Sequence, residues 1–509
     1  MKIKSISINR FRGYEQPVTI QVGDLLSIVG KNDIGKSTIL EALDIFFNES
    51  KGCVKLDKGD INKTCLERGE DCIEISVEFI DLPATLVLDA ANETTLGNEY
   101  LLTQDNTLHV LKRYPSAGKE KVYIRALHPA AAGCNDLLST KIRDLQRIVS
   151  DAGLYCPDRT KSAELRKAIW DSSPDLQLQE CEIEVAKIDA KNIWEQLKGH
   201  MPLFTLFQSD RKNSDGDSEV QDPMSLAVKE IIADPAIQSQ LSDVARTVKA
   251  RLDEVASRTL DKLGTFNSEI ATSLNPLLPE NAELKWADVF KRVAISGEND
   301  VPINKRGSGV KRLVLVSFFM AEAERRQTEQ SLPDIIYAIE EPETSQHPNH
   351  QRHLIDALLE LSRAANTQVL ITTHSPEVVK RLKFDNILLI SGRGEGQIYN
   401  VERNKLPYPS LNEISYSAFG ECSFEYHNEL YGFIEAEERL QEFKSGKDTR
   451  AYNKVKRDGS IVTQQITLTE FIRHQIHHPE NTENDRFSFD ELNESIGAMR
   501  EFIQRDVVE

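Results

Sequence analysis

The sequence predicts an α/β fold in which helices flank a mixed β-sheet, with a helical insertion and a small all-α domain at the C-terminal end. Three observations predict it. A glycine-rich loop at residues 30–37 stands between an apolar run typical of a buried strand and a stretch with apolar residues at helical spacing. Two further apolar runs, at residues 335–339 and 369–373, end in acidic residues and in a histidine. Helical spacing of apolar residues dominates residues 135–290 and the chain after residue 406.

The glycine-rich loop reads GKNDIGKS and fits the phosphate-binding pattern G-x-x-x-x-G-K-[ST] at every constrained position. Its two glycines let the backbone curl so that N–H groups point inward, and the helix that follows offers its positive N-terminus to phosphate oxygens. We expect Lys36 to reach the β- and γ-phosphates of a nucleotide and Ser37 to hold Mg²⁺. The predicted nucleotide-binding residues of this loop are Gly30, Asn32, Gly35, Lys36, Ser37 and Thr38.

An arginine and two aromatic residues precede the loop, in the sequence NRFRGY at residues 9–14. Arg12 could hydrogen-bond to the nucleotide base or stack on it, and we count it among the predicted nucleotide ligands. A solvated turn with a packed Phe11 explains the same residues equally well.

Acidic residues and a histidine follow the two later apolar runs. Residues 340–343 read EEPE, and acidic residues at the carboxyl end of a strand in such a sheet handle Mg²⁺ and the attacking water. Glu340 is predicted to bind magnesium, directly or through water, and Glu341 to polarise the water. The second run ends at His374, which could touch the γ-phosphate. We therefore predict Lys36, Glu341 and His374 as catalytic residues; the alternatives are a solvated acidic turn and a histidine that merely ends a strand.

Composition limits the other classes of function. The 509 residues suffice for two to four domains, and no apolar run approaches the length that crosses a bilayer. The first eight residues alternate as in a strand, unlike a signal peptide, so we expect a cytoplasmic protein. A net charge of −19, from 62 basic and 81 acidic residues, argues against nucleic-acid binding over the whole surface but allows local basic patches. Seven cysteines without a C-x-x-C pair favour reduced thiols.

Four segments are predicted along the chain: an N-terminal lobe at residues 1–134, a helical insertion or arm at 135–290, a C-terminal lobe at 291–405 and a helical domain at 406–509. The first lobe contains alternating strands at residues 73–79, 108–114 and 122–124, which predict an antiparallel sheet. Within the insertion, helical spacing covers residues 161–170, 183–197 and 226–263. The Gly/Ser turn RGSGVKRL at residues 306–313 opens a helix and could present amides and a hydroxyl to an anion.

Taken in order, the P-loop, the helical insertion, RGSGVKRL, IEEPETSQHP and TTHSPE resemble the ATPase head of the ABC/SMC class. In particular they look like the OLD-family and AAA15-type ATPases of bacterial anti-phage systems, among them the Septu PtuA-like proteins. The resemblance covers about residues 1–50 and 290–400. It implies an ABC-type head with ATP and Mg²⁺ as cofactors. It also implies that Ser308 and Gly309 stand at the signature position, which departs here from the usual L-S-G-G-Q, and that two heads clamp two ATP molecules in a homodimer or a higher oligomer.

The same resemblance implies a defence protein that hydrolyses ATP and controls a nuclease effector. OLD proteins usually carry a Toprim nuclease after the head, but no strand ending in D-x-D follows His374, so we expect no Toprim domain in this sequence. The effector is then either the C-terminal domain or a separately encoded nuclease, with RNA or DNA as a further partner. A RecF/SMC-like DNA-repair clamp and a scaffold that hydrolyses little ATP are the alternatives; the acidic balance does not favour the clamp.

The C-terminal segment contains RHQIHH at residues 473–478, and Pro479 disfavours helix at His478, so the predicted helix ends there. An arginine that holds a phosphate and a histidine near its neutral pKa could cleave RNA without a metal. The spacing is similar to the R-[NHD]-x-x-x-H motif of HEPN ribonucleases. That resemblance implies Arg473 as phosphate ligand, His478 as general acid/base and His474 as the polar member of the motif. A noncatalytic dimerisation or docking bundle, and a zinc site from His474, His477 and His478, stay open.

Overall fold

The computed structural model divides the chain into two compact units, each described here by itself. The first unit comprises residues 1–2, 197–339 and 344–369, and the second comprises residues 3–196, 340–343 and 370–509. The residues that the structure describes are 1–32, 34–49, 52–89, 92–185, 191–208, 228, 230–232, 234–241, 243–244, 246–247, 318–319, 321, 326, 334–344, 348–391, 397–400, 410–456 and 458–504.

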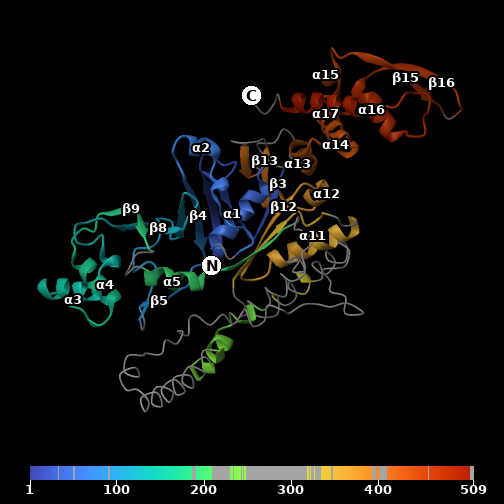
Figure 1. Ribbon diagram of the computed structural model, residues 1–509. Coiled ribbons are helices and arrows are strands. Elements are labelled where there is room, and N and C mark those ends of the chain that lie inside the picture. Colours follow the sequence, from blue (N-terminus) through green and yellow to red (C-terminus); the bar gives the residue numbers. More distant parts are fainter. Residues whose placement is uncertain are drawn as a thin grey trace. The chain divides into compact units, whose positions relative to one another are not determined.

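The second unit contains a six-stranded antiparallel sheet in the order β2-β1-β4-β7-β8-β9 (Figure 1). Its strands are β1 (Lys2–Asn9), β2 (Val18–Gln21), β4 (Cys72–Ile80), β7 (Leu108–Pro115), β8 (Lys121–Pro129) and β9 (Leu178–Glu184). Alternate residues of β4 are buried, as the pattern over residues 73–79 predicts for a half-buried strand. The predicted antiparallel sheet of the N-terminal lobe is therefore confirmed.

Strand β3 (Leu25–Val29) is buried at every residue and leads into the phosphate-binding loop and helix α1 (Lys36–Asn48). β3 pairs in parallel with β13 (Ile387–Ser391), which pairs antiparallel with β14 (Gln397–Asn400). On its other side lies the end of β12 (Thr367–Thr373), so the order is β12-β3-β13-β14. Strand directions in this sheet are mixed, which confirms the predicted α/β fold with a mixed sheet and flanking helices.

In the first unit, β10 (Leu203–Phe207) pairs in parallel with β11 (Ile335–Glu340), and β11 is buried along its whole length. Helix α11 (Pro348–Ser362) follows, and the amide of Ile335 donates to the carbonyl of Asn366 at 2.9 Å, where β12 begins. The first three residues of β12 belong to this unit and the last four to the other.

The predicted helical insertion is only partly helical. Helix α3 (Ile142–Asp151) and α4 (Ser162–Ser172) agree with the helical pattern, but β9 and β10 fall in the same range. The predicted helix at 183–197 is wrong in its first part, because Ile183 lies in β9 opposite Ile124 and the helix α5 (Lys191–His200) begins later. Most of the predicted helix at 226–263 and all of the turn at 306–313 lie outside the described residues.

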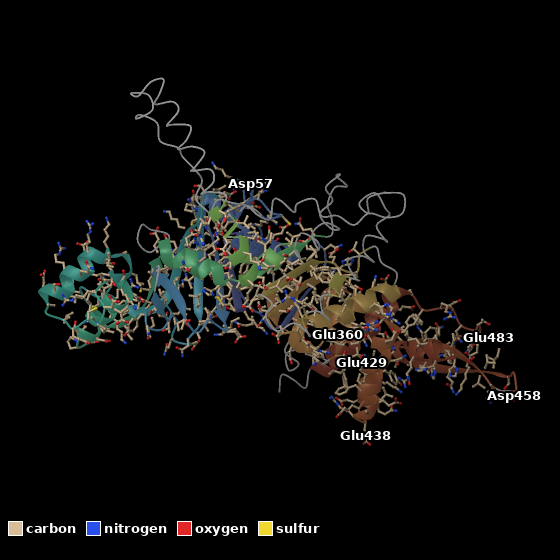
Figure 2. All side chains as sticks on the ribbon, turned by 90° about the horizontal axis from the view of Figure 1, so that it is seen from below. Asp57, Glu360, Glu429, Glu438, Asp458 and Glu483 are labelled. Atoms are coloured by element: carbon tan, nitrogen blue, oxygen red, sulfur yellow. The ribbon has the colours of Figure 1, made fainter. Side chains whose placement is uncertain are left out.

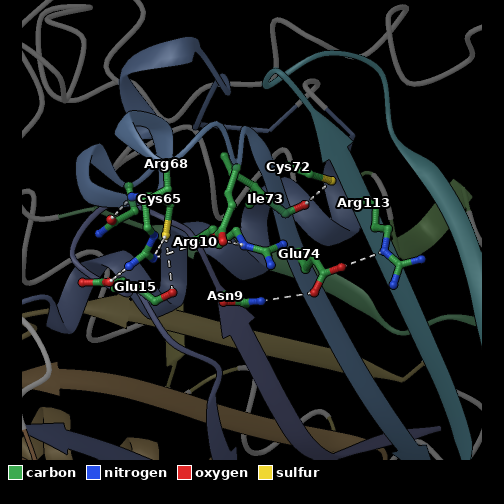
Figure 3. Close-up of polar contacts among 11 residues, drawn as sticks. Asn9, Arg10, Glu15, Cys65, Arg68, Cys72, Ile73, Glu74 and Arg113 are labelled. Carbon is green, nitrogen blue, oxygen red and sulfur yellow. Dashed lines mark hydrogen bonds and ion pairs between the residues drawn. The ribbon is translucent and has the colours of Figure 1, made fainter.

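Polar contacts link neighbouring strands of the antiparallel sheet and the segments beside it (Figure 3). The carboxylate of Glu74 on β4 accepts hydrogen bonds from Asn9 at 3.2 Å and from Arg113 at 2.7 Å. Burial acts to raise the pKa of Glu74, but these hydrogen bonds and the charge of Arg113 outweigh it and lower the pKa. Nearby, Arg68 donates to Glu15 at 2.7 Å.

The C-terminal region is helical, as predicted, and also contains a β-hairpin that the sequence analysis did not identify. Its elements are α13 (Leu411–Phe419), α14 (Phe424–Ala436), α15 (Leu440–Lys444), β15 (Thr449–Val455), β16 (Ile461–Thr467), α16 (Leu468–His477) and α17 (Phe489–Gln504). Helices α14, α16 and α17 share one apolar core. Asp458, labelled in Figure 2, lies in the turn between β15 and β16 and accepts from the amide of Ser460 at 2.9 Å.

Helices α16 and α17 each begin with a capping box, which the patterns TLTE at residues 467–470 and SFDE at residues 488–491 predict. The Thr467 hydroxyl accepts from the amide of Glu470 while the Glu470 carboxylate accepts from the amide of Thr467. Ser488 and Glu491 make the same reciprocal pair before α17, at 2.8 and 3.1 Å.

The remaining short elements are α2 (Lys63–Glu67), β5 (Leu86–Asp89), β6 (Asn92–Thr94), α12 (Pro376–Val379) and three 3₁₀ turns at Lys58–Asp60, Leu137–Ser139 and Phe384–Asn386. All seven cysteines are described, and none of them forms a disulfide bond. None of the described helices has the length and apolar character needed to cross a membrane.

A buried lysine joins the end of α1 to the antiparallel sheet. The ammonium of Lys112 on β7 donates to the carbonyl of Phe46 at 2.7 Å and to the carboxylate of Glu49 at 3.2 Å. It also lies 5.0 Å from the centre of the Phe46 ring and 5.1 Å from that of Trp194. A cation at the C-terminal end of a helix is stabilised by the helix dipole, so Lys112 holds the far end of the helix that begins at the phosphate-binding loop.

Lys112→Met should lower the free energy of unfolding by about 3 kcal/mol, because it removes one partner of a buried ion pair. Urea denaturation followed by circular dichroism measures this change. Lys121→Met, an exposed lysine on the adjacent strand β8, serves as the control and should change stability by less than about 0.5 kcal/mol. Equal effects of the two substitutions would contradict a stabilising role for the Lys112 contacts.

Candidate nucleotide-binding site

The two glycines of the phosphate-binding loop are required by its geometry. A Cβ on Gly30 would lie 2.3 Å from Cδ1 of Ile34 and 2.7 Å from the carbonyl oxygen of Ile390 on β13. Gly35 caps the N-terminus of α1 with φ of +99°, a left-handed conformation that side chains other than hydrogen disfavour. The loop can therefore keep this curl only with glycine at both positions.

Lys36 is the first residue of α1, and only 4% of it is exposed. Its ammonium donates to the carbonyls of Gly30 at 3.0 Å and Lys31 at 2.8 Å, so it lies inside the curl of the loop. The loop backbone, the helix N-terminus and a buried cation together form a cradle of the kind that binds phosphate. The other predicted members surround it: Asn32 is exposed in the loop, and Ser37 and Thr38 occupy the first turn of α1.

Tyr14 supports the loop from the preceding segment, and the sequence analysis did not single it out. Its hydroxyl donates to the carbonyl of Gly35 at 3.0 Å, and its ring is buried. Burial raises the pKa of Tyr14 above its usual value, so the hydroxyl keeps its proton and remains a donor. The only signal was an aromatic residue close to the loop in the chain, which does not specify a contact.

Arg12 is held by two carboxylates beside the loop. Its guanidinium donates to Asp60 at 2.8 Å and forms an ion pair with Glu41 of α1. It also lies 5.0 Å from the centre of the Phe11 ring, and Phe11 is fully buried, as the alternative interpretation of this turn expected. These contacts fix the guanidinium against α1, while its contact with a nucleotide base stays a prediction.

The acidic residues after β11 are held by the end of β12. Glu340 ends β11 and is buried, and Glu341 has a left-handed backbone with φ of 40°. The amide of Glu341 donates to the carbonyl of Thr372 at 3.0 Å and lies 3.2 Å from its hydroxyl. The left-handed backbone of a residue other than glycine costs about 1 kcal/mol or more of conformational free energy. The hydrogen bonds with Thr372 compensate this cost.

Three predicted catalytic side chains lie together at this edge. Oε1 of Glu341 is 3.8 Å from Nζ of Lys36 and 3.2 Å from Nδ1 of His374. His374 follows β12, and its side chain is 40% exposed, whereas that of Glu341 is 22% exposed. A carboxylate that faces both a lysine and an imidazole at a partly open surface can orient a water molecule and exchange a proton.

The predicted Mg²⁺ ligands fit the ion by their chemistry. Ser37 offers a hydroxyl in the first turn of α1, and Glu340 offers a carboxylate at the end of β11; both are the oxygen ligands that Mg²⁺ prefers. Ser308 and Gly309, the predicted signature residues, lie outside the described residues.

The predicted ribonuclease residues of α16 do not all converge. The Arg473 guanidinium lies 4.0 Å from the centre of the Tyr431 ring and donates to Glu435 at 3.2 Å, both on α14. His474 instead stacks on Tyr452 of β15, with ring centres 5.0 Å apart. Arg473 is therefore directed toward α14, where an aromatic ring and a carboxylate attract its cation.

His474 and His478 do share a cavity of about 360 Å³. Its lining also includes Tyr452, Lys454 and Glu480, and His478 lies 3.1 Å from Glu480. Burial lowers the pKa of His474. Within the described part of the chain, no three His, Cys, Asp or Glu side chains are grouped so that they could hold a metal ion. This finding does not support the zinc alternative for His474, His477 and His478.

Gly30→Ala should weaken ATP binding by about tenfold or more, because the added methyl group collides with the backbone of Ile390 and forces the loop out of position. Titration with a fluorescent ATP analogue measures the affinity. Gly23→Ala is the matched control, since its added methyl group makes only an ordinary contact with Leu25, 3.8 Å away. Equal affinities for Gly30→Ala and the unmodified protein would contradict this account of the loop.

Two known proteins are similar to this chain in sequence. The OLD nuclease of Thermus scotoductus is 23% identical over 405 residues, which are 76% of this chain and 62% of that protein. A Clostridium perfringens protein named as an ABC transporter ATP-binding protein is 47% identical over 53 residues, 10% of this chain and 9% of that protein. The chain thus spans less than two thirds of the length of both relatives.

Two solved structures show weaker likeness, which concerns the fold alone. An SMC head bound to the C-winged helix domain of ScpA is 14% identical to this chain, with a TM-score of 0.35. The match covers 80% of this chain and 99% of the SMC head chain. The SMC head domain from Thermotoga maritima is 13% identical, with coverages of 79% and 100% and a TM-score of 0.32.

A family model does cover most of the chain. The AAA_15 model, described as an AAA ATPase domain, matches residues 1–379, which include the phosphate-binding loop, the acidic turn and His374. This protein therefore belongs to the AAA_15 family and carries an AAA ATPase domain.

Proposed function

We propose that this protein binds and hydrolyses ATP, dimerises through its ATPase heads and controls a nuclease effector in bacterial anti-phage defence. The position of Glu341 is the main support for ATP hydrolysis. Its carboxylate lies 3.8 Å from the ammonium of Lys36 in the phosphate-binding loop and 3.2 Å from Nδ1 of His374. A nucleotide phosphate in the cradle of the loop would lie beside all three side chains.

Each residue has a distinct task in this mechanism. The loop amides and Lys36 bind and orient the phosphates, and Ser37 with Glu340 would hold Mg²⁺, which neutralises charge on the phosphate oxygens when bound. Glu341 orients the attacking water and accepts its proton. His374, a neighbour of Glu341, donates a hydrogen bond toward the γ-phosphate. Arg12 adds a contact to the nucleotide from the preceding turn.

Dimerisation and effector control rest on the family resemblance. Ser308 and Gly309 of one copy would complete the site of another, so that two ATP molecules lie at the interface of two heads. Because a contact made only in the closed dimer favours that state, ATP binding would close the dimer and hydrolysis would open it. The similarity to an OLD nuclease supports a nuclease effector, either a separate protein or the C-terminal region.

A second candidate function is RNA cleavage by the C-terminal region. The cavity between β15 and the end of α16 favours it, because His474, His478 and Lys454 line the same space. One imidazole could take a proton from a 2′-hydroxyl while the other protonates the leaving oxygen, and a lysine could stabilise the phosphate charge. Arg473 then acts outside this cavity, through its contacts with α14.

Glu341→Gln should reduce ATP hydrolysis by about 10²-fold or more while ATP binding persists, because an amide cannot accept the proton of the water. It should also accumulate an ATP-bound dimer. Phosphate release and light scattering after gel filtration measure the two effects. The matched control is Glu360→Gln, an exposed residue of α11 labelled in Figure 2, which should change neither. A dimer that ignores both ATP and Glu341→Gln would instead favour the scaffold alternative.

His478→Ala should lower RNA cleavage by about 10²-fold if the cavity is a ribonuclease site, since it removes one proton-transfer group. Cleavage of purified tRNA, with and without ATP, measures the effect. His353→Ala, at an exposed position of α11, is the control. Unchanged cleavage or unchanged toxicity in cells would favour a noncatalytic dimerisation or docking role for this region.

A further inference from the structure

A third glutamate in the acidic turn has no role in the mechanism above. Glu343 is 4% exposed, and its Oε1 accepts a hydrogen bond from the Thr373 hydroxyl at 2.6 Å and from the amide of His374 at 3.2 Å. The same oxygen lies 3.8 Å from Nδ1 of His374. Two consecutive residues at the end of β12 thus donate to a single buried carboxyl oxygen.

We propose that Glu343 is a positioning residue for ATP hydrolysis, which fixes the His374 imidazole against Glu341 through its contacts with Thr373 and the His374 backbone. The proposal rests on the proposed function, because it assumes that Glu341 and His374 act in hydrolysis. Glu343 itself is too deeply buried to touch the nucleotide, so it acts only through His374.

The geometry explains why a buried carboxyl group is suited to this task. Oε1 of Glu341 and Oε1 of Glu343 lie 3.2 and 3.8 Å from Nδ1 of His374, so two carboxylates of one turn flank the ring nitrogen at ion-pair distance. The backbone of Glu341 is meanwhile bound to Thr372. Three consecutive residues, Thr372, Thr373 and His374, therefore contact two glutamates of the acidic turn. The His374 ring could move away only if several of these contacts broke.

The energetics of Glu343 support a specific arrangement. Burial raises the pKa of its carboxyl group, and the hydrogen bonds from Thr373 and from the His374 amide act in the opposite direction. A carboxyl group placed in a buried position costs free energy unless its acceptor sites are used. A leucine would fill most of this space without that cost but could not accept hydrogen bonds from the two donors.

The first test is a double-mutant cycle with His374. Glu343→Ala should lower kcat about tenfold or more and leave the KM for ATP within about twofold, because binding does not involve His374 orientation. In the His374→Ala background the same substitution should have no further effect on kcat, since the ring that it positions is gone. Glu343→Gln, whose amide oxygen can accept both hydrogen bonds, should restore most of the activity.

Thr373→Val gives a test that does not depend on the folding of Glu343→Ala. It keeps the buried carboxyl group and removes one donor, so kcat should fall about threefold or more in the presence of His374 and not in its absence. Thr107→Val is the matched control: its hydroxyl donates to Glu78 at the same distance of 2.6 Å, but in the antiparallel sheet. It should alter the thermal midpoint of unfolding without altering kcat.

The outcomes separate this inference from the proposed function. In one outcome, His374→Ala lowers kcat, and Glu343→Ala lowers kcat by the same factor whether or not His374 is present. Glu343 then acts on the fold alone, and the positioning role is overturned. If neither His374→Ala nor Glu341→Gln affects hydrolysis, the proposed catalytic site is wrong. If kcat falls in Glu343→Ala only when His374 is present, the positioning role is supported.

Discussion

The buried ammonium of Lys36 is the constraint on which the nucleotide site depends. A buried charge is tolerated only when it is hydrogen-bonded or paired; Lys36 is 4% exposed, donates to two loop carbonyls and lies 3.8 Å from the carboxylate of Glu341. A phosphate oxygen that binds Lys36 would share its ammonium with these groups, so binding is linked to the position of Glu341.

Glu341 and Glu343, which are separated by one residue, lie in different environments. The Glu341 side chain is 22% exposed and faces two cationic or titratable groups, whereas that of Glu343 is 4% exposed and accepts from neutral donors. The first environment suits a group that must meet water, and the second suits a group that must hold its neighbours still. The proline between them, Pro342, has a φ fixed by its ring, which limits the conformations of this turn.

The local features of this protein followed from its sequence because short-range chemistry determines them. The strand, loop and helix around Gly30 and Gly35, the ends of β11 and β12, and both capping boxes depend on residues within a few positions of each other. Strands β9 and β10 were missed because their pairing partners lie far away in the chain: Ile183 pairs with Ile124, and Phe204 with Ile336. The hairpin of β15 and β16 did carry a local signal, the Asp458-Gly459 turn between alternating runs, which the helical reading of this region overlooked. The contacts of Tyr14 with Gly35 and of Arg473 with α14 depend on tertiary structure and had no local pattern.

The structure of the second unit also bears on how hydrolysis could reach the C-terminal region. Helix α12 begins two residues after His374, and α13 contacts both α12 and β13, the strand whose Ile390 carbonyl closes against Gly30. At the end of α13, Gly420 adopts a left-handed conformation, and a Cβ there would lie 3.9 Å from the ammonium of Lys31 in the phosphate-binding loop. The first C-terminal helix therefore packs against elements that adjoin both sides of the nucleotide site. A shift of the loop, or of His374 through α12, would reach α13, because packed elements transmit displacement rather than absorb it.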